Sequence, residues 1–161
     1  MSENKKGRIL VIDDDEGVRK VVAEALKSEG YLVDTASNGK EAVEKSRTNF
    51  YNLALIDIRL PDMEGTKLLT SMKETTPEMI KIILTGYPAL QNAIDVVNKG
   101  AHGYLVKPIN MDELLRTVEQ HLKKQSEMKQ YSQERVAEFV ETRFKELQTE
   151  ERDTPKTTKK E

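Results

Sequence analysis

The sequence predicts an α/β protein built on a doubly wound, five-stranded parallel sheet in the strand order 2-1-3-4-5. Two observations lead to this fold. Short apolar runs of the kind that form buried strands alternate with helical patterns as far as about residue 124, and such alternation indicates a parallel sheet covered by helices on both faces. Four of these runs end abruptly in a carboxylate, a hydroxyl or an amine side chain, and ligands bind at that end of the strands in open α/β sheets.

The first part of the chain contains two strand–helix units. Residues 8–12 form an apolar strand, and the helix after it carries an i, i+3, i+4 apolar stripe that Gly30 closes. Residues 31–36 form the second expected strand. Asn38 then supplies a side-chain acceptor for the next helix, and Glu41 follows at the spacing of a capping box.

Three further strands are expected at residues 53–57, 80–84 and 103–106. Each is followed by a helical pattern, which completes the alternation. Pro88 is suited to the first turn of the helix after the fourth strand, and Gly100 ends that helix. The chain therefore predicts five strands and five helices in regular alternation.

Side chains that can carry chemistry stand at the ends of four strands. Asp13 and Asp14 follow the first strand, Asp57 closes the third, Thr85 closes the fourth, and Lys107 follows the fifth. The predicted strand order makes the first and third strands neighbours at the switch point of the sheet, so the three carboxylates come together. Carboxylates that gather in this way raise each other's pKa unless a positive charge joins them.

Oxygen-only ligands, without histidine or cysteine, indicate a hard divalent cation such as Mg²⁺. An amine and a hydroxyl beside the cation suit in-line phosphoryl transfer, because the equatorial oxygens of the transferring group need positive and hydrogen-bonding partners. Asp57 is the candidate nucleophile, and an aspartyl phosphate would be the product.

With these motifs in place, residues 8–124 resemble the receiver domain of two-component response regulators, whose fold is flavodoxin-like. The resemblance rests on a set of short motifs that follow the strands in the right order. They are Ile12-Asp13-Asp14, Asp57 with Pro61 and Gly65, Thr85-Gly86, and Tyr104-Leu105-Val106-Lys107-Pro108.

The resemblance implies a role for each residue at the sheet edge. Asp57 would accept the phosphoryl group and, with Asp14, ligate Mg²⁺ directly. The backbone carbonyl of Arg59 would be a further ligand, and Asp13 would act through a metal-bound water. Lys107 would contact the phosphate.

The resemblance also implies a switch. Thr85 would bind the phosphate and form the switch pair with Tyr104, and the Lys107-Pro108 peptide bond would be cis. Arg59 and Tyr87 stand at positions that border the site. Both side chains are bulky, so we expect them to crowd the water that removes the phosphoryl group and to slow its loss.

Composition excludes several other classes of protein. The chain has no cysteine, and its two histidines, His102 and His121, are far apart in sequence, which excludes thiol chemistry and makes a histidine metal cluster unexpected. A net charge of −2 does not favour nucleic acid or an anionic membrane as a direct partner. No apolar stretch approaches the roughly 20 residues of a membrane span, and we expect a soluble, cytoplasmic protein.

The predicted organisation has four parts: a flexible N-terminus at 1–7, the receiver domain at 8–124, an amphipathic helix at 125–150 and a disordered tail at 151–161. The apolar side chains of the third part fall within one arc of a helical wheel. They are Val136, Phe139, Val140, Phe144 and Leu147. This helix either pairs with another copy or with a partner protein, folds back onto its own receiver domain, or remains frayed.

The sequence thus predicts a stand-alone response regulator that is phosphorylated by a histidine kinase or a histidine phosphotransfer protein. Its output would be a change in binding to a downstream protein, with a possible homodimer, rather than a built-in enzyme activity. The alternative from a different class is the receiver and linker helix of a DNA-binding transcriptional regulator. A third interpretation, a structural adaptor that is not phosphorylated, is disfavoured by the complete acidic site.

Overall fold

The computed structural model describes residues 6–86 and 95–153 of the chain. The chain divides into two compact units, Met1–Leu122 and Lys123–Glu161. The features predicted at Tyr87 and Pro88 lie outside the described residues.

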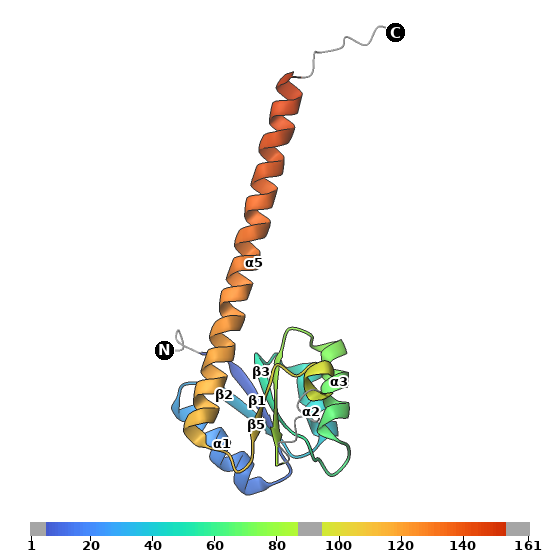
Figure 1. Cartoon of the computed structure of the whole chain (residues 1–161), viewed down its shortest axis with the longest axis vertical. Helices are drawn as coiled ribbons and strands as arrows, with labels where there is room; N and C mark the ends of the chain where they lie inside the picture. The colour runs from blue at the N-terminus through green and yellow to red at the C-terminus, as the bar shows by residue number, and fades with distance from the viewer. Residues whose placement is uncertain (1–5, 87–94, 154–161) are drawn as a thin grey trace. The chain divides into compact units, whose positions relative to one another are not determined.

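A five-stranded, all-parallel sheet forms the centre of the first unit, and it confirms the predicted order (Figure 1). The order is β2-β1-β3-β4-β5. The strands are β1 (Arg8–Ile12), β2 (Leu32–Ala36), β3 (Leu53–Asp57), β4 (Ile80–Thr85) and β5 (Gly103–Val106). The second strand begins one residue later than predicted and the fourth ends one residue later, which is the usual uncertainty of strand ends.

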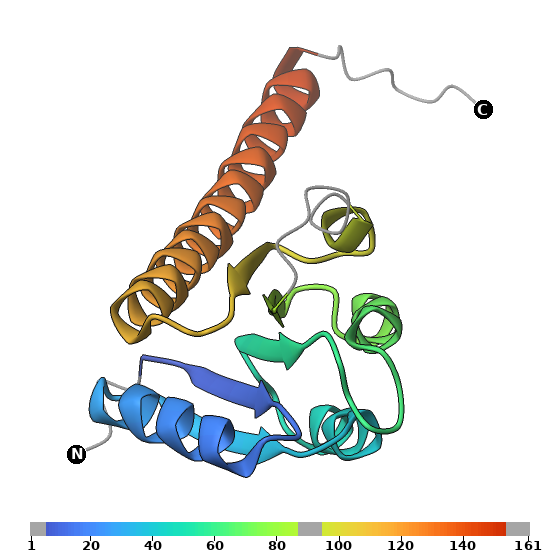
Figure 2. The same cartoon turned by 60° about the horizontal axis from the view of Figure 1, so that its bottom comes forward.

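Helices cover both faces of the sheet, as the near-continuous apolar strands require (Figure 2). The helices are α1 (Glu16–Ser28), α2 (Gly39–Thr48), α3 (Gly65–Thr75) and α5 (Met111–Asp153). Alternate residues of β1 point to opposite faces of the sheet. Ile9 and Val11 pack with α1 and the first turns of α5. Leu10 and Ile12 pack with α2 and α3. Every residue of β3 and β4 is buried.

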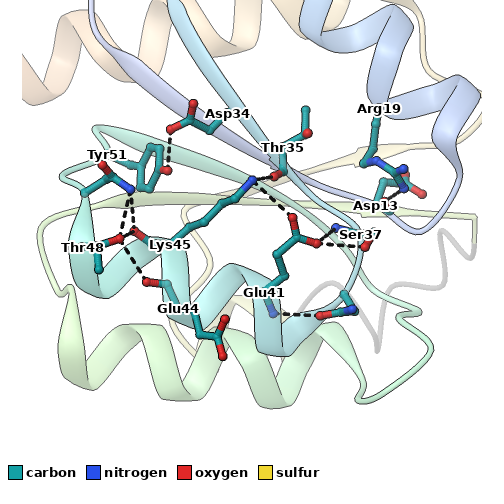
Figure 3. A network of polar contacts seen from close by, with 12 residues as sticks. Asp13, Arg19, Asp34, Thr35, Ser37, Glu41, Glu44, Lys45, Thr48 and Tyr51 are labelled. Atoms are coloured by element: carbon teal, nitrogen blue, oxygen red, sulfur yellow. Dashed lines mark hydrogen bonds and ion pairs between the residues drawn. The ribbon is translucent and has the colours of Figure 1, made fainter.

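The helix ends use the caps that the sequence indicates, with one difference. Asn38 Oδ1 accepts the Glu41 N–H at 2.8 Å, and Gly30, which closes α1, has a φ of +97°. The Glu41 carboxylate, however, does not return to the cap residue itself. It accepts the N–H of Ser37 at 3.0 Å and its hydroxyl at 2.9 Å, one residue earlier in the chain (Figure 3).

Helix α5 runs without interruption from Met111 to Asp153. The helix continues across residues 124–125, where the predicted receiver domain ends, and it ends three residues beyond the predicted end at residue 150. The physical reason lies in the sequence, because no glycine or proline occurs between Met111 and Asp153. Residues 154–161, the rest of the predicted tail, lie outside the described residues.

The predicted apolar arc of the second unit is solvent-exposed within that unit. Its side chains have exposed fractions between 56% and 66%. They are Val136, Phe139, Val140, Phe144 and Leu147. Charged pairs such as Lys145–Glu141, at 3.4 Å, support the helix from other positions on its surface. None of the described helices is both long and apolar enough to cross a membrane.

One buried lysine lies away from the carboxyl edge of the sheet. The side chain of Lys81 is 1% exposed, and its Nζ donates to the carbonyls of Thr76 at 2.7 Å and Met79 at 2.9 Å. Burial lowers the pKa of Lys81 to about 8, and the nearby charge of Lys73 acts in the same direction. The folded protein therefore releases this proton more readily than the unfolded chain does.

We expect this lysine to make stability rise with pH. Below about pH 8 Lys81 is charged in both states, whereas between about pH 8 and 10.5 only the unfolded chain keeps the proton. Because the unfolded state then binds more protons, the free energy of unfolding increases across this window, by at most about 3 kcal/mol. Urea unfolding of the wild type and of Lys81→Met at pH 7.5–10.5 measures the effect. Parallel stability profiles for the two proteins would contradict it.

Candidate functional site

The three predicted carboxylates meet at the carboxyl edge of the sheet. Asp13 and Asp14 follow β1, and the pairing of Ile12 with Ile56 places Asp13 beside Asp57 at the end of β3. One carboxylate oxygen from each of the three residues lies within 4.8 Å of the others. Asp13 and Asp57 are buried, whereas Asp14 is exposed, so the cluster opens to solvent on one side.

Hydrogen bonds hold Asp13 in a single orientation. Its Oδ1 accepts the N–H of Asp15 at 3.0 Å, and its Oδ2 accepts Lys107 Nζ at 3.0 Å. Its backbone carbonyl accepts Arg19 Nη1 at 2.7 Å (Figure 3). Contacts with residues at the start of α1 and with Lys107, which follows β5, therefore fix the orientation of Asp13 without any ligand.

Lys107 is the cation within this cluster. Its Nζ lies 3.0 Å from Asp13 Oδ2 and 3.4 Å from Asp57 Oδ2. Burial alone would lower the pKa of Lys107, but the hydrogen bond and charge of Asp13, together with those of Asp57, raise it above its ordinary value. The ammonium group therefore stays charged between the two carboxylates.

One ammonium group does not balance three carboxylates. Burial raises the pKa of Asp57 to about 6, and repulsion from Asp13 also raises it. The hydrogen bond from the Arg59 N–H and the charge of Lys107 lower this pKa, but they do not outweigh burial. When all three carboxylates are ionised, Lys107 leaves two negative charges uncompensated. A divalent cation would supply that balance, and the all-oxygen donor set is the one that Mg²⁺ prefers. The residues present therefore fit the expected cofactor.

The remaining predicted residues lie around this cluster. Thr85 ends β4, is buried, and accepts the Lys107 N–H with its carbonyl at 2.7 Å. Arg59 is exposed, and its backbone N–H donates to Asp57 Oδ1 at 3.2 Å. Tyr104 lies on β5 and is 42% exposed. The cis peptide bond between Lys107 and Pro108 is confirmed.

Gly65 entered the sequence analysis only as one residue of a motif, and Asp62 was given no role. A Cβ atom at Gly65 would lie 2.3 Å from the carbonyl oxygen of Asp57, so only glycine allows α3 to start this close to the end of β3. The Asp62 carboxylate binds the backbone of Gly39 and Lys40. These partners lie more than 20 residues earlier in the chain, and no local pattern signals such a contact.

The fold and the site together define an α/β protein with a candidate cation site at the switch point of a doubly wound parallel sheet. The family model of the response regulator receiver domain matches residues 9–119. The chain therefore belongs to the response regulator receiver family of two-component systems, which confirms the resemblance seen in its motifs.

Individual relatives and solved structures agree with this assignment. The chain is 36% identical over 114 residues to the transcriptional regulatory protein ZraR of Klebsiella oxytoca, an alignment that covers 71% of this chain and 26% of ZraR. A CheY-like receiver domain protein from Methanospirillum hungatei JF-1 is 41% identical, with a TM-score of 0.73 and coverage of 75% of this chain and 97% of that one.

NtrX from Brucella abortus, solved in complex with ATP, is 27% identical, with a TM-score of 0.74. The similarity covers 79% of this chain and 29% of NtrX. The chain spans about a quarter of the length of the curated relatives it matches.

Proposed function

We propose that this chain is a phosphorylation-controlled switch in which Asp57 accepts a phosphoryl group from a histidine kinase or a histidine phosphotransfer protein. The observation that carries the proposal is the position of the Asp57 carboxylate. It ends a fully buried strand, lies 3.4 Å from Lys107 Nζ and shares a 4.8 Å cluster with Asp13 and Asp14. A nucleophile with a cation partner at an open acidic site is the arrangement that phosphoryl transfer needs.

In the proposed reaction, an Asp57 carboxylate oxygen attacks phosphorus while the bond between phosphorus and the imidazole nitrogen of the donor breaks, and the nitrogen keeps the electron pair. Lys107, already held beside Asp57 at 3.4 Å, contacts an oxygen of the transferring group. Asp14 and Asp57 would hold Mg²⁺ together with the Arg59 carbonyl, and Asp13 would act through a bound water. When bound, the ion neutralises the carboxylates that would otherwise repel the incoming phosphoryl group.

The proposal includes no separate enzyme activity. The same residues promote transfer to Asp57 and, with water as the acceptor, its later loss. Arg59 follows Asp57 by two residues and has a bulky side chain, and we expect it to hinder attack by water. We propose a cytoplasmic location, with which the absence of cysteine from the chain agrees.

The output of the switch is a change in protein binding. The Thr85 hydroxyl gains a charged acceptor when Asp57 is phosphorylated, and its movement leaves space for the half-exposed ring of Tyr104 to turn inward. Because this is a shift between two conformations, it depends on contacts that differ between them.

The Thr85→Ala variant is therefore expected to accept phosphate but to lose the change at Tyr104. Ring signals of Tyr104 in NMR spectra, recorded with and without a small phosphodonor, measure the coupling. Thr85→Ser is the matched control, because it keeps the hydroxyl and should keep the shift. A Tyr104 shift in Thr85→Ala as large as in the wild type would show that the switch uses other residues.

A second function is favoured by a specific observation: ZraR is a transcriptional regulator, and this chain corresponds to about a quarter of its length. In that case the chain is the receiver and linker helix of a DNA-binding regulator, and α5 is the linker. Both candidates share the phosphoacceptor site, so they differ in what the helix transmits and not in the chemistry at Asp57.

Removal of the metal tests the proposed function directly. With Mg²⁺ and a small phosphodonor we expect the intact mass to increase by one phosphoryl group, and with excess chelator we expect no increase. The reason is that two uncompensated carboxylate charges repel the phosphoryl group when the cation is absent. Re-addition of Mg²⁺ serves as the control for loss of folded protein. Equal labelling with and without chelator would contradict the proposed role of the cation.

A further inference from the structure

The loop between β3 and α3 is attached to a second element of the fold through Asp62. The Asp62 Oδ1 accepts the N–H of Gly39 at 2.8 Å, and Oδ2 accepts the N–H of Lys40 at 2.9 Å. These are the first two N–H groups of α2, and groups at that position have no partner within their own helix. Bonds from N–H groups to a carboxylate are about twice as strong as neutral ones, and the positive end of the helix strengthens them.

Asp62 completes a cap that local sequence leaves unfinished. The Asn38 side chain accepts the Glu41 N–H, the third of the helix, and the Glu41 carboxylate binds Ser37 outside the helix. The two hydrogen bonds from Gly39 and Lys40 hold the pKa of the Asp62 carboxyl below its usual value, so the group stays ionised at neutral pH.

Close packing adds a second, independent attachment. A Cβ atom at Gly39 would lie 2.5 Å from Met63 Sδ, which means that the loop rests directly on the backbone at the start of α2. The tip of the loop, Asp62 and Met63, is therefore held both by charge and by contact.

The residues at the start of the same loop, Asp57 and Arg59, belong to the proposed cation and phosphoryl-transfer site. Arg59 N–H donates to Asp57 Oδ1 at 3.2 Å, Arg59 pairs with Glu64 across the loop, and Gly65 N–H donates to the Ile58 carbonyl at 2.7 Å. The Arg59 carbonyl, an expected ligand of the cation, stands three residues before Asp62. The contacts at the tip and the position of this carbonyl are thus parts of one closed loop.

We propose that Asp62 is a positioning residue for the cation site: by clamping the β3–α3 loop to the N-terminus of α2, it holds the Arg59 backbone and the Asp57 side chain in the geometry that binds the cation. The inference rests on the proposed function, because it assigns a role at the same site. Asp62 does not touch the reacting atoms, and its effect passes through Arg59.

The test compares Asp62→Ala and Asp62→Asn with the matched control Glu41→Gln. The control alters a carboxylate at the same end of α2 that has no bond to the β3–α3 loop. Mg²⁺ affinity is measured by NMR titration without any phosphodonor, and exchange of the Gly39 and Lys40 amide hydrogens reports on the clamp itself. The rate of labelling by a small phosphodonor is then measured against Mg²⁺ concentration.

For Asp62→Ala we expect faster exchange at both amides and Mg²⁺ affinity weaker by about tenfold, the scale of substitutions that disturb groups supporting a metal ligand. The labelling rate should recover to within about twofold of wild type at saturating Mg²⁺, because the nucleophile and Lys107 are intact. Asp62→Asn keeps one oxygen acceptor, so its amide exchange rates and its Mg²⁺ affinity should lie between those of the wild type and those of Asp62→Ala. Glu41→Gln should keep the wild-type Mg²⁺ affinity.

A merely structural role would give a different result. It would lower the melting temperature of the Asp62 and Glu41 variants alike and leave the Mg²⁺ affinity of the folded proteins unchanged, and that outcome overturns the inference. A wild type that binds Mg²⁺ but is never phosphorylated overturns only the phosphoacceptor assignment. A wild type that binds no cation overturns the inference together with the cofactor.

Discussion

The Asp57→Asn variant is expected to lose phosphoryl labelling completely and to keep its fold. The substitution replaces a carboxylate oxygen by an amide nitrogen of the same size, so the nucleophile is removed while the shape of the buried side chain stays the same. The carboxamide oxygen can still accept the Arg59 N–H that Asp57 Oδ1 accepts at 3.2 Å. Repulsion from Asp13, which contributes to the raised pKa of Asp57, disappears, so the melting temperature should not fall.

Intact mass after incubation with Mg²⁺ and a small phosphodonor measures the effect, with peptide mapping to locate the modification in the wild type. Asp95→Asn is the matched control, because Asp95 is an exposed carboxylate that pairs with Lys99 away from the acidic cluster. We expect full labelling of the control and none of Asp57→Asn. Undiminished labelling of Asp57→Asn would place the phosphoacceptor elsewhere.

Truncation after Lys124 is expected to convert a dimer into a monomer. Five large apolar side chains of the second unit are more than half exposed within that unit, and they share one arc of α5. Burial of each such side chain contributes roughly 1.5–3 kcal/mol before the costs of association. A second copy of the helix provides a matching apolar face, and packing against it would further stabilise the helix.

Light scattering at micromolar concentration measures this prediction, with the full chain as a dimer and the truncated chain as a monomer. The double variant Val140→Glu, Phe144→Glu introduces charges into the arc and should also be monomeric. Glu141→Gln, which lies outside the arc, should remain dimeric. A full chain that is monomeric with and without phosphate would show that the helix folds back or binds a different protein.

Much of the site followed from the strand ends. Asp13, Asp57 and Lys107 could be assigned to one place because parallel strands bring their carboxyl ends to the same edge, and because apolar runs fix where each strand ends. The pairing of Ile12 with Ile56 and the 3.0 Å contact of Lys107 with Asp13 agree with that assignment. The roles in phosphoryl transfer and cation binding stay predictions, to be decided by the experiments above.

The length of α5 shows how much a local signal can indicate. Residues 123–130 are mostly polar, but many polar residues are good helix formers, and no glycine or proline stands between Met111 and Asp153 to end the helix. The continuous helix from Met111 to Asp153 agrees with these local signals, and its first turns are also held by the sheet core. What its apolar arc contacts depends on another surface, and no pattern within the helix identifies that surface.

By itself, the sequence determined the strand order, the acidic edge of the sheet and the helix caps that lie within a few residues of their partners, because each of these follows from local periodicity or from the rules of parallel sheets. Only the tertiary structure decided that Asp62 clamps the site loop to α2 and that Lys81 is buried against the carbonyls of Thr76 and Met79. In sequence, Asp62 is one more charged loop residue and Lys81 an ordinary polar position in a strand. Folding brings backbone N–H or carbonyl groups next to these two side chains. Because almost every residue carries such backbone groups, the sequence does not indicate which of them will contact Asp62 or Lys81.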